Sequence, residues 1–390
     1  MSFLLLLLAL LCAAPAPVLA KTKSPATKGV VAPLDLRATH DQLITQVAAE
    51  YDTSKGGWVT KGQPVESAVE LAFQIAREKP DSEWKGRALG TVDWMHALLD
   101  TIGGGFVGSL AEQDHEISKF EKRTVPNARR LENLIDAWQI SGDLRYRRDA
   151  ERVVDFFERV LLDARGGFIT DQVGDRDLQP AANGVAMHAY LRWAEVTGNR
   201  RFLNFALKSA DRVYKNCWDD AGVLLRRGTF GEVLQYPQLD DQVEMGRGLV
   251  LAYQLGKRPV DLERARAMGE LLIARFQDPR GGFRTQSAPT KKGEVKKAAR
   301  ESGENAAAAR FLCELATASG DAKYREAAKS AWAPFREDLA KAGLESADWA
   351  LAARADFAPT EPRVPDWQVV ESIPATTQPR TMRFRPGKRR

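Results

Sequence analysis

The chain has 390 residues, of which 44% are hydrophobic and 28% are charged, and its formal net charge is +5. Its apolar content can fill a sizeable core, which excludes a wholly disordered chain, a collagen and a coiled coil. Three cysteines exclude a disulfide scaffold, and four histidines are too few for a histidine-rich metal site. The length suits two or three average domains or one large repeat barrel, and we expect no cofactor or metal.

The first twenty residues have the pattern of a secretory signal peptide. An apolar run over residues 3–14 is followed by Val18-Leu19-Ala20, which places small residues at −3 and −1 before Lys21. The run is shorter than the about 20 residues of a membrane span. A lipid anchor at Cys12 is disfavoured, because Leu11 is larger than the residue that usually precedes a lipidated cysteine. We predict a secreted or periplasmic protein with no integral membrane segment after cleavage.

Positive charge is concentrated at the two ends of the chain. Residues 21–30 carry three lysines and no acid, and residues 357–390 carry seven basic residues against three acidic ones. We interpret residues 21–35 as a basic linker and 357–390, which contain six prolines, as an extended and disordered tail. A solvated tail is favoured over one that touches an anionic polymer or lipid surface. No nucleic-acid partner is expected, because aromatic and basic residues are not interleaved.

Between the ends, one outline of two helices and two turns occurs four times. The first turn of each unit combines glycine with a polar residue, at 141–143, 197–199, 255–257 and 319–321. The second turn is glycine-rich, at 104–106, 166–168, 220–222 and 281–283, and Gly56-Gly57-Trp58 belongs to the same series. Glycine suits the end of a helix because it tolerates a left-handed backbone.

Helical periodicity fills the segments between these turns. Leu131, Leu134, Ile135 and Trp138, for example, have the spacing of one helical face. Helix pairs are predicted over residues 64–103, 127–164, 183–218, 241–277 and 305–340, with single helices over 37–51 and 345–356. If the first and last helices pair, the chain has six hairpins. We therefore predict an all-α fold, an (α/α)6 barrel over residues 36–356, with a superhelical array of hairpins as the alternative.

A polar residue stands sixteen positions before the end of each first turn, and the four are Asn127, Asn183, Asp241 and Asn305. Helix capping alone explains them, because Asn and Asp are preferred N-caps. If these helices line the barrel, however, their N-termini meet at one mouth and can bind a ligand there.

Aromatic, amide and carboxylate side chains near this mouth suit a sugar, whose ring faces stack on aromatics while its hydroxyls bond to polar groups. The predicted saccharide-binding residues are Asn127, Asn183, Asn305, Trp58, His188 and Tyr236. For Trp58 the alternative is a turn aromatic packed on the barrel, and for His188 a histidine packed in the core.

The chain resembles the helical-barrel portion of the spermatogenesis-associated thioredoxin-like proteins, over roughly residues 45–340. That barrel is itself similar to N-acylglucosamine 2-epimerases and six-hairpin glycosidases. The most specific matches are Gly103-Gly104-Gly105-Phe106 and Lys119-Phe120-Glu121-Lys122. Further matches are Tyr51-Asp52, Gly56-Gly57-Trp58, Asn127, Ala137-Trp138-Gln139, Gly142-Asp143, Gly166-Gly167-Phe168, Leu239-Asp240-Asp241 and Glu304-Asn305.

The chain also departs from this family's pattern. No thioredoxin domain and no Cys-x-x-Cys motif are visible, which excludes dithiol chemistry. Lys119 replaces the family's histidine before Phe-Glu-Lys, and Asp171 and Asp175 match the family's acidic stretch only loosely. The resemblance therefore implies the fold more firmly than a reaction.

The favoured function is a carbohydrate-active enzyme of the glycosidase type, which needs a carboxylic acid and a second carboxylate. Asp241 and Glu121 are the preferred pair, with Asp240 in reserve, because adjacent acids raise each other's pKa. The alternative for Asp240 and Asp241 is a helix cap beside a first-turn acid.

Two other functions are considered. A non-catalytic module would bind a saccharide or a cell-envelope protein without turnover, and the missing thioredoxin domain and histidine favour it. A sugar epimerase or isomerase is the third, since epimerases of the resembling fold use paired histidines. Only His188 lies on a predicted inner helix, so this function is the least favoured.

Overall fold

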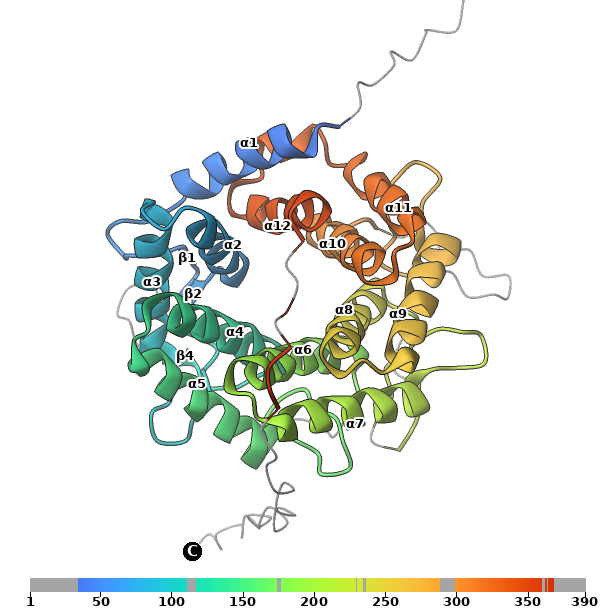
Figure 1. Cartoon of the computed structure of the whole chain (residues 1–390), viewed down its shortest axis with the longest axis horizontal. Coiled ribbons are helices and arrows are strands. Elements are labelled where there is room, and N and C mark those ends of the chain that lie inside the picture. The colour runs from blue at the N-terminus through green and yellow to red at the C-terminus, as the bar shows by residue number, and fades with distance from the viewer. Residues whose placement is uncertain are drawn as a thin grey trace, which may run out of the picture. The chain divides into compact units, whose positions relative to one another are not determined.

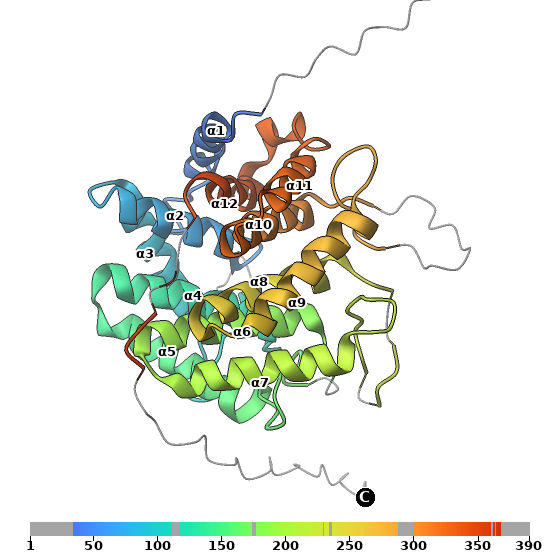
Figure 2. The same cartoon turned by 45° about the vertical axis from the view of Figure 1, so that its right-hand side comes forward.

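A computed structural model describes residues 34–110, 117–173, 177–228, 230–233, 236–287, 299–359, 362 and 364–367. Within them, twelve α-helices form two concentric rings, seen end-on in Figure 1. The inner ring contains α2 (Glu66–Glu78), α4 (Thr124–Ser141), α6 (Pro180–Thr197), α8 (Leu239–Gly256), α10 (Ser302–Ser319) and α12 (Ser346–Phe357). The outer ring contains α1 (Leu36–Ala49), α3 (Glu83–Met95), α5 (Leu144–Phe156), α7 (Arg200–Cys217), α9 (Pro259–Leu271) and α11 (Ala322–Trp332). Figure 2 shows α7 and α9 outside α6 and α8.

The inner ring is closed. Each inner helix packs against the next, and α12 packs against α2. The first helix, α1, packs against α12, so the two ends of the described barrel form the sixth hairpin. The predicted (α/α)6 barrel is confirmed, whereas the superhelical array is wrong, because the end hairpins of an open array do not meet.

Three of the inner helices begin three residues earlier than predicted, at Thr124, Pro180 and Ser302. The residues that precede them make no side-chain cap bond. Asn127, Asn183 and Asn305 therefore lie inside their helices, at the fourth position, and the expectation that they are N-caps is wrong.

Four inner helices are capped at their C-terminus by a residue in the left-handed conformation. Three of these caps are glycines, whereas the cap of α8 is Lys257, with a φ of 54°, and not a glycine. The glycines are Gly142, Gly198 and Gly320. When these four helices are aligned on their left-handed caps, Gln242 of α8 takes the position of Asn127, Asn183 and Asn305. Asp241 lies one residue before that position.

Longer connections lead from each outer helix to the next inner helix. They share a turn in which a residue one to six positions after the outer helix forms an antiparallel bridge with a residue one or two positions after the last glycine. Such bridges join Leu99 to Phe106, Leu162 to Phe168, Trp218 to Leu224 and Gln277 to Phe283. Two connections add antiparallel strand pairs, β1 (Val59–Thr60) with β2 (Gln63–Pro64) and β3 (Ser109–Leu110) with β4 (Ile117–Lys119).

The apolar core lies between the two rings. Phe157, Phe168, Tyr190 and Phe205 are all buried, and their rings pack mostly edge-to-face with centroids 5.0–6.1 Å apart. None of the helices in the described residues is long and apolar enough to cross a membrane.

Candidate functional site

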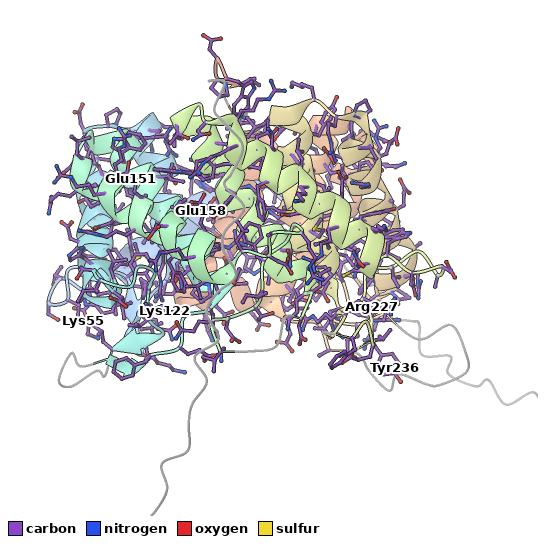
Figure 3. The ribbon with its side chains drawn as sticks, turned by 90° about the horizontal axis from the view of Figure 1, so that it is seen from below. Lys55, Lys122, Glu151, Glu158, Arg227 and Tyr236 are labelled. Atoms are coloured by element: carbon purple, nitrogen blue, oxygen red, sulfur yellow. The ribbon has the colours of Figure 1, made fainter. Side chains whose placement is uncertain are left out.

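The barrel has two ends, which differ in their connections. We call the end at which the inner helices begin the N-terminal mouth and the opposite end the C-terminal mouth. The long connections lie at the N-terminal mouth. Figure 3 views the barrel from the side and places Lys55, Lys122, Arg227 and Tyr236 toward this mouth.

The three asparagines predicted to bind a saccharide hold these connections in place. The backbone N–H of Phe168 donates to Asn183 Oδ1 at 2.8 Å, and Asn183 Nδ2 donates to the carbonyl of Phe168 at 3.0 Å. The same clasp joins Asn127 to Phe106, Asn305 to Phe283 and Gln242 to Leu224. Asn127, Asn183 and Asn305 are fully buried, and their amides are used by the backbone. A structural role replaces their predicted role in binding.

Trp58 is also part of the barrel wall. It is fully buried, its Nε1 donates to the carbonyl of Val47 at 2.7 Å, and its ring stacks on Trp84 with centroids 5.7 Å apart. No ring face is left for a sugar, so the alternative of a packed turn aromatic is correct. Tyr236, by contrast, is 62% exposed.

In the structure, the predicted catalytic residues Glu121 and Asp241 belong to separate groups of charged side chains. Glu121 forms an ion pair of 2.8 Å with Arg123, just before α4. Asp241 instead belongs to a group of carboxylates at the N-termini of α8 and α10.

This carboxylate cluster consists of Asp240, Asp241 and Glu304 around Arg226. Arg226 Nη2 is 2.6 Å from Asp240 Oδ2, and its Nε is 2.8 Å from Asp241 Oδ2. The second oxygen of Asp241 accepts the backbone N–H of Ala181, at the start of α6, at 3.0 Å. Asp241 is thus fixed on both sides and 1% exposed, whereas the Asp240 side chain is 37% exposed.

Glu304 is the carboxyl of the cluster best suited to carry a proton. Burial, followed by the negative charges of Asp240 and Glu301, raises its pKa to about 7. Its Oε2 atom is buried and makes no hydrogen bond. Burial and the charge of Asp240 also raise the pKa of Asp241. The cluster therefore holds carboxyls that are protonated near neutral pH.

Deeper inside the barrel, charged side chains form a belt across five inner helices. Arg310 of α10 donates to Glu70 of α2 at 2.5 and 3.1 Å and to Glu314 at 2.9 Å. The belt continues from Glu314 through Arg247, Glu244, Arg129 and Glu132 to His188 of α6.

The belt and the cluster perturb their carboxyl groups in opposite directions. Although burial alone would raise it, the guanidinium groups of Arg247 and Arg310 lower the pKa of Glu314 to about 2. Arg310 likewise outweighs burial and lowers the pKa of Glu70, as His188 does for Glu132. Glu70, Glu132 and Glu314 therefore stay ionised and paired, which excludes these three as proton donors near neutral pH.

Two cavities lie on either side of this belt, whose residues Glu70, Glu132, Arg247 and Arg310 line both. The first, of about 230 Å³, is lined mainly from the N-terminal halves of α2, α4, α8, α10 and α12 and lies on the side of the N-terminal mouth. The second, of about 250 Å³, is lined from their last turns and by Ala358, Pro359 and Pro362.

The first cavity adjoins the carboxylate cluster. Asp240 stands one helical turn before Glu244, and Glu304 one turn before Ala307, and both Glu244 and Ala307 line the cavity. The cavity also contains Asp348, whose pKa is raised by burial to about 6.

Of the histidines, only His188 lines one of these cavities within the described residues. His40 lies on α1, His96 follows α3, and His115 is outside the described part of the chain. The described residues contain no group of three His, Cys, Asp or Glu side chains that could hold a metal ion.

Sequence reasoning placed His188 on an inner helix but missed the rest of the belt. The signal of the belt was present as charged residues at helical spacing, such as Arg129 and Glu132 on α4. A charged stripe on a helix normally indicates a solvated face, and only closure of the ring turns this face inward.

No family model matches the chain. Solved structures do share its fold. A D-mannose isomerase superposes with a TM-score of 0.69 and 14% identity, covering 83% of this chain and 97% of the isomerase. The cellobiose 2-epimerase of Bacillus thermoamylovorans gives 0.66 and 12%, covering 77% and 87%.

An α-1,6-mannanase of a Salegentibacter species, in an inactive variant with two consecutive aspartates replaced and bound to α-1,6-mannotetrose, gives a TM-score of 0.62 and 12% identity. The match covers 84% of this chain and all of the mannanase. These similarities establish the six-hairpin barrel. They lend no support to the narrower resemblance to the spermatogenesis-associated thioredoxin-like proteins.

Proposed function

We propose that the protein hydrolyses glycosidic bonds at the N-terminal mouth, with Glu304 and Asp240 as the reacting carboxyl groups. The observation that carries this proposal is the carboxylate cluster, in which two helices bring three carboxyls around one guanidinium above a cavity of about 230 Å³. The predicted pair of Asp241 and Glu121 is thereby revised.

The roles follow from the surroundings of each carboxyl. A glycosidase needs one carboxylic acid to protonate the leaving oxygen and a second carboxylate as base or nucleophile. Glu304, with a pKa of about 7 and an unbonded oxygen, suits the acid. Asp240 suits the second role because it is the more exposed aspartate. Asp241 is a positioning residue, since it fixes Arg226 and the start of α6.

The similarity to the mannanase supports hydrolysis of a glycosidic bond as the reaction. Its inactive variant has two consecutive aspartates replaced, and this chain has consecutive aspartates, Asp240 and Asp241, in the cluster. Linear α-1,6-linked manno-oligosaccharides are therefore the first substrates to test.

The test is hydrolysis by the variants Glu304→Gln and Asp240→Asn, measured as new reducing ends. Each is expected to lower kcat/KM by roughly 10²- to 10⁴-fold, as for loss of a general acid or base. Asp220→Asn is the matched control, since Asp220 is an exposed acid of the same mouth outside the cluster. Glu304→Gln should keep most activity on an aryl glycoside whose leaving group needs no proton. Equal losses on both substrates would contradict the acid role.

A sugar isomerase is the second candidate, favoured by the contact between His188 and Glu132 inside the barrel. A single base can move a proton between neighbouring carbons on one face of a sugar, whereas epimerisation needs groups on both faces. One histidine therefore fits an isomerase better than an epimerase. Incorporation of solvent deuterium into mannose or fructose, lost in His188→Gln, would favour this function over hydrolysis.

A non-catalytic module that binds a saccharide or an envelope protein remains the alternative to both enzymes. It would give saturable saccharide binding with no hydrolysis and no deuterium exchange.

We also propose that the protein is exported by the signal peptide at residues 1–20, which lie outside the described residues. Mass spectrometry of the mature protein should then give an N-terminus at Lys21. An intact Met1 would contradict export by cleavage.

A further inference from the structure

Beside the carboxylate cluster, a short hairpin projects from the N-terminal mouth. Its described residues are 227–228 and 230–233, and Arg227 forms an antiparallel bridge with Val233. Its tip residue, Phe230, is 94% exposed, and Tyr236, just after the hairpin, is 62% exposed. We infer that Phe230 and Tyr236 form a platform for sugar units beyond the cleaved bond, so that the substrate is a linear oligosaccharide and not a short glycoside. This inference rests on the proposed hydrolase.

The hairpin is held firmly, which distinguishes it from a loose loop with an apolar tip. The N–H of Gly228 donates to the carbonyl of Glu232 at 3.0 Å, and the Phe230 N–H donates to the Glu232 carboxylate at 3.1 Å. At its base, Arg227 exchanges two backbone bonds with Leu178, of 2.8 and 3.1 Å. These bonds hold the described backbone around Phe230, whose ring is 94% exposed.

The base of the hairpin is joined directly to the proposed reaction centre. Arg226, the residue before the hairpin, bonds to both Asp240 and Asp241. Phe230 follows Arg226 by four residues, and a chain of that length reaches at most about 14 Å. Phe230 is thus near enough to contact a sugar unit next to those at the cluster.

The second aromatic residue lies on the same side of the mouth. Figure 3 places Tyr236 close to Arg227, projecting away from the barrel. Gln238 Nε2 donates to the carbonyl of Tyr236 at 2.6 Å, which fixes the backbone there. Exposed aromatics on ordered backbone present flat apolar faces to water, and a sugar ring covers such faces well.

The test measures binding, so that it does not depend on turnover. The inactive Glu304→Gln variant is titrated calorimetrically with α-1,6-linked mannobiose and mannotetraose. The tetraose is expected to bind more tightly than the biose. Adding Phe230→Ala should weaken the tetraose about tenfold and leave the biose unchanged. Ile102→Ala is the matched control, because Ile102 is 97% exposed on another connection of this mouth.

Three results would overturn the platform. These are an unchanged tetraose affinity in Phe230→Ala, equal weakening of both sugars, and no binding of either sugar. If the wild type hydrolyses tetraose while Phe230→Ala binds it normally, the platform fails and the hydrolase stands. If tetraose binding depends on Phe230 but no glycoside is cleaved, the hydrolase fails and the site is a binding module.

Discussion

The two mouths of the barrel are built by different means. At the C-terminal mouth, two-residue turns such as Gly142-Asp143 join α4, α6, α8 and α10 to their outer partners, and each turn begins with a left-handed residue. In three of these turns an Asp or Asn side chain then caps the outer helix. At the N-terminal mouth, long connections are clasped by buried amides of the next inner helix. A two-residue turn has no spare residues that could bind a ligand. The long connections do, because the clasps fix their bases and leave the residues farther from the barrel free to differ in sequence.

The largest effect on stability is expected at Trp58, at the first connection of the N-terminal mouth. Trp58→Ala removes a fully buried ring and the bond to Val47, and should lower the free energy of unfolding by about 4 kcal/mol. Urea denaturation measures this loss. Tyr236→Ala is the control, since an exposed side chain should change stability by less than about 0.5 kcal/mol. A stable Trp58→Ala variant with weakened saccharide binding would restore the predicted binding role.

The clasps and the caps of the two mouths can be compared directly. Asn183→Ala leaves the buried N–H and carbonyl of Phe168 unbonded and should cost about 3 kcal/mol. Asn199, the N-cap of α7 at the opposite mouth, accepts only the N–H of Arg201, so Asn199→Ala should cost about 1 kcal/mol. Chemical denaturation measures both losses. If the two variants lose the same free energy of unfolding, a clasp contributes no more to stability than a helix cap.

The pH dependence of stability should differ between the mouth and the belt. The pKa of Glu304 is raised from 4.5 in the unfolded chain to about 7, so the folded state binds the proton more tightly. Its contribution to stability is complete below pH 4.5 and is lost as the pH rises through 7. Glu304→Gln should therefore raise the melting temperature at pH 8 and leave it unchanged at pH 4. The pKa of Glu314 is lowered from 4.5 to about 2, so its contribution has the opposite sign: it is complete above pH 4.5 and is lost as the pH falls through 2. A Glu304→Gln variant with the wild-type pH profile would contradict the raised pKa.

The smallest effects are expected at the left-handed residues of the C-terminal mouth. Gly142 has a φ of 73° and open space around its Cα, so Gly142→Ala meets backbone strain alone and should cost about 1 kcal/mol. Lys257→Gly relieves the same strain at the end of α8 and should stabilise the barrel by a smaller amount. Thermal unfolding of both variants tests these two predictions. Melting temperatures that change in the same direction in both variants would contradict them.

The helical hairpins were visible in the sequence because their signals are local. Apolar spacing such as Leu131, Leu134 and Ile135 and the glycine turns need no distant partner. The count of hairpins then gave the closed ring. The predicted polar series was out of register in α8 alone, where Lys257 has the left-handed conformation that a glycine has after α4, α6 and α10.

The candidate site was predicted less well, because its residues depend on distant neighbours. Asp240 and Asp241 were recognised from their adjacency. The pairing of Glu121 with Arg123, and the exchange of Asp241 for Gln242 in the clasp series, were not visible in the sequence. Asn183 has the same identity whether it caps a helix, binds a sugar or clasps Phe168, so identity alone could not decide among these roles.

The sequence by itself thus determined the helices, their pairing and their number, since periodicity and glycine turns act within a few residues. Only the tertiary structure decided which face of each helix lines the barrel. That choice sets the burial of every ionisable group. It buries Glu70 and Glu314 beside arginines, which keep them charged, and brings Glu304 close to Asp240, which favours its protonated form. The physical reason is that the sign of a pKa shift depends on burial and on the nearest charge, and ring closure fixes both across helices far apart in the chain.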